Sequence, residues 1–315
     1  MKNIILFLII FFNITIVQAQ QTDEMRFNFD NQFLRNPAAL CAWNQTELGL
    51  YYQNNFTAIS NAPVNMFAGL QFAVPNQNVS VGLAVYNENA GVINNTSINL
   101  SSSYKILNMF NNGDYLAGGI GVTFNRVGVN GDKIKATNTN DPLIANGFES
   151  AFGTNLGFGV FYSSLRSMDP RSRRSSFQFG LSGLKALPQN VNLTSLSYKE
   201  QFYFGGLAAA IIPLSKDMSW RSQLELQYEG GKLFNGILST EMRFVNLVHV
   251  GVSYDKFNTI GFLVGLTLSD LLVSDTELAF VVNGNMPLGE LDTYVNPGIA
   301  FGLQYRFTAN KFSKF

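Results

Sequence analysis

The sequence has few of the residues on which most protein chemistry depends. Its 315 residues include one Cys and one His, so an internal disulfide is excluded and a zinc site built from Cys and His is disfavoured. Only 13% of the residues are charged, about half of the share found in soluble domains. Lys and Arg together number 21, as do Asp and Glu, so the net charge is zero. A nucleic-acid-binding protein that relies on a strong basic field is therefore excluded.

Long hydrophobic runs are also scarce. Residues 207–214 form the longest apolar stretch after the N-terminal region, and Pro213 interrupts it. This is far below the roughly 20 residues that a membrane-spanning helix needs, so helical spans are excluded there. Nevertheless 46% of the residues are hydrophobic, which argues against a disordered chain. The apolar residues must therefore lie in short elements.

The first residues have the pattern of a secretory signal peptide. Lys2 gives a positively charged start, residues 4–17 are mostly apolar, and Val17-Gln18-Ala19 resembles a signal-peptidase site. We expect residues 1–19 to be the signal peptide, with cleavage after Ala19. An uncleaved N-terminal anchor is the alternative, although the apolar run is short for one.

From about residue 47 onward, the chain alternates repeatedly between large apolar residues and small or polar ones. In residues 79–86, Val and Leu at odd positions alternate with Ser, Gly and Ala, and residues 248–254 and 299–307 show the same period of two. Such alternation is typical of β-strands with two different faces. One face is bulky and aromatic, whereas the other is rich in Gly and carries few charges.

These two faces favour a membrane barrel over a soluble β-sandwich. A sandwich buries its apolar face and usually carries many Lys and Glu residues on its wet face. A transmembrane barrel instead points apolar residues at lipid and small or polar residues at its interior. An open strand edge in lipid would leave unpaired peptide groups, so the sheet must close. The sequence therefore predicts an all-β fold, a closed antiparallel transmembrane β-barrel of about 14 strands.

The predicted division of the chain is a signal peptide (1–19), an N-terminal periplasmic segment (20–46), an outer-membrane barrel (47–307) and a C-terminal tail (308–315). An even number of strands places both ends of the barrel sequence on one side. The expected strands are 47–53, 65–74, 79–87, 96–105, 115–126, 152–163, 175–184, 201–212, 219–229, 233–244, 247–254, 259–268, 276–283 and 297–307.

Charged residues on the small, polar face form the candidates for a luminal network. Charges held away from water need partners, so these residues are expected to pair across the lumen. Packing of a plugged or narrow barrel is favoured over a selectivity filter, and the single His is favoured as a network member over a catalytic base. The candidates are Arg221, Glu225, Glu241, Arg243 and His249.

Several short motifs occur in order along the first half of the chain; their residues are Asn36, Pro37, Ala38, Asn54, Phe56, Ala62, Pro63, Asn87 and Gly91. These motifs resemble those of the PorP/SprF family, which belongs to the type IX secretion system of Bacteroidota. Their order and spacing match over residues 32–127, and the remainder is compatible in length and pattern up to Phe307. Phe56 departs from the usual Trp of that family, and Leu40-Cys41 stands where small residues are usual.

The resemblance implies an outer-membrane barrel that is not an enzyme and has no cofactor. Such proteins look like accessories for export or surface anchoring of particular secreted cargo, notably adhesins with a type B C-terminal sorting domain, and the family is linked to gliding motility. Implied partners are that cargo, outer-membrane lipids and, in some members, a periplasmic lipoprotein ring or a peptidoglycan-binding component.

Two alternatives stay open: an outer-membrane solute channel for sugars or hydrophobic compounds, and a barrel hydrolase that uses His249 as its base.

Overall fold

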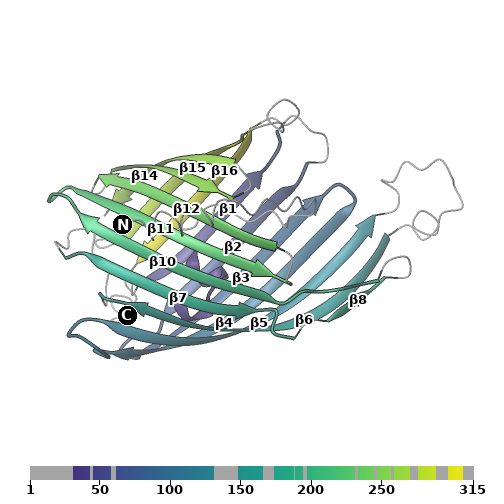
Figure 1. The fold of residues 1–315 in the computed structure, drawn as a ribbon, viewed down its shortest axis with the longest axis horizontal. Helices are drawn as coiled ribbons and strands as arrows, with labels where there is room; N and C mark the ends of the chain where they lie inside the picture. The colour runs from purple at the N-terminus through teal and green to yellow at the C-terminus, as the bar shows by residue number, and fades with distance from the viewer. Residues whose placement is uncertain are drawn as a thin grey trace, which may run out of the picture.

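The computed structural model shows a closed antiparallel barrel of fourteen strands among the residues that it describes (Figure 1). These residues are 31–42, 45–57, 62–130, 148–165, 174–187, 189–193, 197–230, 233–244, 247–256, 259–269, 276–288 and 297–307. The predicted fold class is confirmed. The barrel strands are β1 (Thr46–Asn54), β2 (Val64–Ala73), β3 (Val79–Ala90), β4 (Ile93–Leu107), β5 (Tyr115–Asn130), β6 (Phe148–Ser163), β7 (Ser176–Leu184), β10 (Tyr203–Pro213), β11 (Met218–Glu229), β12 (Leu233–Phe244), β13 (Val248–Asp255), β14 (Thr259–Ser269), β15 (Thr276–Pro287) and β16 (Gly298–Phe307).

Each barrel strand pairs with its neighbours in the sequence, with one exception. β8 (Asn190–Asn192) and β9 (Ser197–Lys199) form a separate two-stranded sheet, so β10 pairs with β7 instead. The ring closes where β1 pairs with β16 along its whole length, from Thr46 opposite Phe307 to Asn54 opposite Ile299. The small hairpin was not expected from the sequence, whereas all fourteen barrel strands overlap their predicted ranges.

The barrel is apolar outside and polar inside, as the alternation predicts. On β1, Leu48 and Leu50 are 44% and 46% exposed, whereas Glu47 and Gln53 on the opposite face are 4% and 0% exposed. The other strands show the same alternation, with most Leu, Val and Phe side chains outside and Ser, Asn, Gln and Arg inside; Phe67, Phe161 and Val281 are buried on the inner face. This arrangement is that of a membrane barrel, in which the lipid-facing surface is apolar and the interior is polar.

The two ends of the barrel differ, and both are used below as reference points. We call the end at which β1 begins and β16 finishes the terminal end, and the other the distal end; Thr46 and Phe307 pair at the terminal end. The distal end carries the tight turn between β3 and β4 at Gly91 and Val92. Gly91 has a positive φ of 61°, a conformation that costs glycine little and other residues more.

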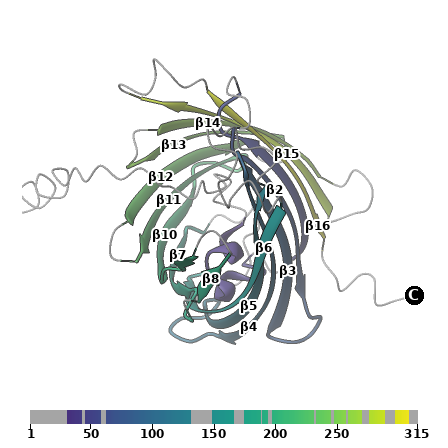
Figure 2. The ribbon, with the colours of Figure 1, turned by 90° about the vertical axis from the view of Figure 1, so that its right-hand side faces the viewer.

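Two short 3-10 helices lie inside the ring of strands (Figure 2). They are η1 (Gln32–Leu34) and η2 (Pro37–Ala39). None of the helices in the described part of the chain has the length and apolar character needed to cross a membrane.

Candidate functional site

The interior of the barrel holds a segment of its own chain, residues 31–42, which we call the luminal segment. Pro37 stands at the start of η2, where its fixed φ and missing N–H are tolerated. Asn36 precedes it as the N-cap, and its Oδ1 accepts a hydrogen bond from the Ala38 N–H at 2.9 Å. The Asn-Pro-Ala motif therefore encodes a capped turn that reverses the chain within the lumen.

The side chain of Asn36 also joins this turn to the barrel wall. Its Nδ2 donates to the carbonyl oxygens of Val160 on β6, at 3.0 Å, and Leu181 on β7, at 3.3 Å. One buried amide thus caps a helix and bridges two strands. Asn36→Ala would remove both the helix cap and the hydrogen bonds to the two strands. Asn36→Asp would keep an oxygen for the cap but would lack the Nδ2 hydrogens that bond to Val160 and Leu181.

Glycines in the wall make room for the turn. A Cβ on Gly119 of β5 would lie 2.6 Å from the Ala38 Cα and would overlap the backbone of Pro37 and Ala38. A Cβ on Gly180 of β7 would come within 2.8 Å of Asn36 Nδ2, and one on Gly159 of β6 would overlap the same side chain. We call these three glycines, Gly119, Gly159 and Gly180, the glycine bed; they lie on three neighbouring strands, and the turn packs directly on them.

Beyond the turn, the luminal segment is held by a buried lysine. Lys105 on β4 is 4% exposed, and its Nζ donates to the carbonyl oxygen of Cys41 at 2.6 Å. The Cys41 N–H donates to Gln71 Oε1 on β2 at 2.9 Å. Cys41 has a φ of 51°, which is unfavourable for a residue with a side chain, so these hydrogen bonds hold a backbone conformation that would otherwise be rare.

Burial should make the Cys41 thiol unreactive. The side chain is buried, and loss of hydration raises the pKa of Cys41 to about 11, so at pH 8 it is un-ionised and a poor nucleophile. We expect maleimide to label Cys41 about 100-fold more slowly in the folded barrel than in the urea-unfolded chain. Mass spectrometry of samples taken over time would measure both labelling rates. Because the folded state binds the thiol proton more tightly than the unfolded chain does, the free energy of unfolding should fall as the pH rises from 9.0 to about 11. Equal rates in both states would contradict the burial of Cys41.

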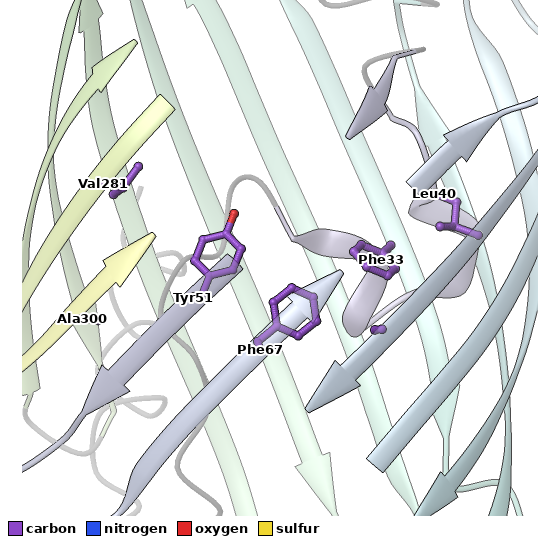
Figure 3. Packing of buried hydrophobic residues seen from close by; sticks show 7 residues of the cluster. Phe33, Leu40, Tyr51, Phe67, Val281 and Ala300 are labelled. Atoms are coloured by element: carbon purple, nitrogen blue, oxygen red, sulfur yellow. The ribbon is translucent and has the colours of Figure 1, made fainter. Parts of the chain in front are cut away.

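Buried hydrophobic side chains pack one side of the luminal segment against the barrel wall (Figure 3). Phe33 packs with Phe67 of β2, with ring centroids 6.3 Å apart, and Phe67 packs with Tyr51 of β1 at 5.6 Å. Leu40 belongs to the same cluster and is fully buried. This cluster is a core inside the barrel, because it closes the segment against β1, β2 and β3 rather than against lipid.

On the opposite side of the lumen, the segment meets the predicted charged residues. Arg35 forms an ion pair with Glu225 of β11, and Gln32 Nε2 donates to Gln223 Oε1 at 3.0 Å. Of the sequence candidates, Glu225 therefore pairs with the luminal segment. Arg35 was absent from the predicted network, because nothing in its local sequence shows that it enters the barrel.

The other four candidates are brought together around one carboxylate. Oε1 of Glu241 on β12 lies 3.6 Å from Arg221 Nη1, 3.4 Å from Arg243 Nε and 3.2 Å from His249 Nδ1. All four side chains are nearly inaccessible. They lie near the terminal end, since Arg243 pairs with His249 one residue from the last residue of β12. We call this the Glu241 cluster.

A second buried ion cluster was not predicted. Arg306 of β16 donates from Nε to Glu47 Oε2 at 2.7 Å, and its Nη1 lies 3.7 Å from Glu277 Oε2 on β15. Glu47 and Arg306 are paired across the closing seam between β1 and β16. The alternation already placed Arg306 on the inner face, so its inward direction was available from sequence, although its partners were not.

The remaining motif residues lie at the distal end. Asn54 ends β1 and its Oδ1 accepts from the Phe56 N–H at 3.2 Å, while Ala62 and Pro63 precede β2. Asn87 of β3 donates through Nδ2 to Thr96 Oγ1 of β4 at 2.7 Å, close to the Gly91 turn. The motifs therefore divide into a luminal group, Asn36-Pro37-Ala38, and a distal group that shapes two connections.

The interior combines a docked chain segment with paired buried charges. Among the described residues, no three His, Cys, Asp or Glu side chains are grouped so that they could hold a metal ion. The Glu241 carboxylate is shared by two guanidinium groups and His249, an arrangement that neutralises buried charge. What the geometry provides is a chain segment docked across the inside of a membrane barrel.

Comparisons with known proteins agree with this architecture. The family model described as type IX secretion system membrane protein PorP/SprF matches residues 17–314. No curated protein matches the chain. Among solved structures, the CymD monoaromatic hydrocarbon channel superposes with a TM-score of 0.52 at 13% identity, covering 89% of this chain and 93% of that one. The toluene transporter TodX of Pseudomonas putida also gives a TM-score of 0.52, at 8% identity, covering 89% and 94%. At such identities the likeness shows the fold alone.

Proposed function

The chain belongs to the PorP/SprF family of type IX secretion system membrane proteins, and from this premise we propose that it is an outer-membrane accessory for export or surface anchoring of a specific secreted protein. The single observation that carries the proposal is the family match, which spans residues 17–314. The partner would be an adhesin-type cargo with a type B C-terminal sorting domain. A periplasmic lipoprotein ring or a peptidoglycan-binding component would be a further partner.

The luminal segment supports a recognition role over transport. Residues 31–42 are tied to β2, β4, β6, β7 and β11 by hydrogen bonds and an ion pair. A segment fixed at so many points opposes free passage of a solute. In this proposal the barrel is a fixed membrane platform, and the surfaces at its ends engage the cargo.

Deletion of the gene should abolish surface display of one or a few secreted proteins while other secreted proteins remain. A cargo-specific accessory acts on its own substrate, so the general secretion apparatus should continue to work. Quantitative mass spectrometry of proteins shaved from intact cells would measure the loss, with a complemented strain as the control. An unchanged surface proteome in the deletion strain would refute the proposed function.

The second candidate is a solute channel, because the two similar structures are described as a hydrocarbon channel and a toluene transporter. Planar-bilayer recording distinguishes the two functions. A steady ion conductance from the purified barrel would favour the solute channel, and no measurable conductance would favour the secretion accessory.

A further inference from the structure

Strand β6 has a long stretch with a neighbour on only one side. β5 pairs with all sixteen residues of β6, from Phe148 to Ser163. β7 pairs with β6 only over Phe158–Ser163. Within the described part of the chain, Phe148–Gly157 therefore has no ladder partner on the side of β7. We call this stretch the β6 edge; it lies in the distal half of the barrel, beside β8.

At the even-numbered residues of the β6 edge, the peptide N–H and C=O groups point away from β5, to the side on which β7 pairs farther along the strand. The Leu156 carbonyl accepts a hydrogen bond from the Ala186 N–H at 2.9 Å. The side chain of Gln189 accepts from the Thr154 N–H at 3.1 Å and donates to the Thr154 carbonyl. A side-chain amide thus occupies the place that a peptide group of an adjacent strand would take. Ser150 and Phe152 continue the same alternation farther along the edge.

The surroundings of this edge make an uncovered state costly. Phe152 is 77% exposed on the outer face and Leu156 is 43% exposed, so the edge borders the apolar, lipid-facing surface. Peptide N–H and C=O groups that meet hydrocarbon without partners cost several kcal/mol each. Among the described residues, Ala186 contacts the peptide group of Leu156 and Gln189 contacts that of Thr154, whereas a continuous extended chain would cover the whole row.

We propose that the β6 edge is an acceptor for an extended segment of the secreted partner, which adds to the barrel wall as a strand. The exposed groups are alternating peptide donors and acceptors, and another extended polypeptide is the ligand that matches such a row. The Gln189 amide would be displaced when that strand binds. This inference rests on the proposed function, because it names the place where the cargo is held.

A proline at Ser150 tests the inference without breaking the barrel's own ladder. The Ser150 N–H points away from β5, as the parity with Thr154 requires, so Ser150→Pro removes one donor from the edge alone. We expect Ser150→Pro to lower surface display of the deletion-dependent proteins at least about tenfold, whereas Ser150→Ala keeps normal display. Heat-modifiable mobility on gels would verify that both variants form closed barrels.

Photo-crosslinking identifies the occupant. A benzoylphenylalanine at Phe152 in intact cells should form an adduct with a protein whose display is lost in the deletion strain. An adduct with residues 131–147 of the same chain, or with no protein, would overturn the inference, as would normal display in the Ser150→Pro strain. Those results leave the proposed function standing when deletion still abolishes display, so the two failures are distinguishable.

Discussion

Replacing Gly119 by Val should release the luminal segment from the wall and raise the labelling rate of Cys41 about 100-fold. The new side chain would meet the backbone of Pro37 and Ala38, and backbone atoms of a capped turn cannot move aside as a flexible side chain would. Overpacking of this kind costs up to about 3 kcal/mol, which corresponds to roughly a 100-fold shift in the docking equilibrium. Maleimide labelling of Cys41 at pH 8 in the reconstituted barrel would measure it.

The neighbouring glycine is a matched control for this prediction. Gly118 is on the same strand but faces outward, and a Cβ there meets no atom within 4 Å. Gly118→Val should therefore label as slowly as the wild type. Equal labelling of the two variants would show that the glycine bed does not hold the turn. A smaller clash in Gly119→Ala would give an intermediate rate and guards against a Val variant that does not fold.

Removing the charge of Glu241 should destabilise the barrel by about 3 kcal/mol or more. Glu241→Gln keeps the shape of the side chain but leaves the buried guanidinium groups of Arg221 and Arg243 without the carboxylate that they share. An uncompensated buried charge is far more costly than the loss of an exposed pair. Urea unfolding of the barrel in lipid vesicles, followed by tryptophan fluorescence, would measure the change.

The pair Lys185–Glu229 provides the comparison. Its atoms lie 3.4 Å apart, but its side chains are 37% and 23% exposed, so Glu229→Gln should cost less than about 1 kcal/mol. If both variants lose the same stability, then Glu241 is not the neutralising centre of its cluster.

The strands were predictable because their signal is local. Alternation along 79–86 or 248–254 depends only on which face of a strand meets lipid, so single residues carry the information. The prediction therefore located all fourteen barrel strands and the inward direction of Arg221, Glu241, Arg243 and His249. Short strands such as β8 lie in a polar stretch without alternation, which explains why the prediction omitted them.

The luminal segment was missed because its contacts are distant in sequence. Arg35 and Glu225 are separated by 190 residues, and Asn36 and Val160 by 124. Hydrophobic periodicity describes only neighbouring residues, so it cannot predict contacts between residues so far apart in the sequence. The residues 20–46 were treated as one polar segment ahead of the barrel, whereas their described part, residues 31–42, includes the buried Phe33, Leu40 and Cys41. Two sequence clues were available: the Asn-Pro-Ala turn, and the excess of glycine on the inner face of three strands.

The luminal segment stands just ahead of β1, one of the two strands that close the barrel. The ring of strands is closed by the pairing of β16 with β1. Leu40 and Cys41 lie within six residues of Thr46, so the luminal segment is close in sequence to one of the two strands of that seam. A chain that lacked β16 would therefore have neither a closed wall nor an enclosed luminal segment.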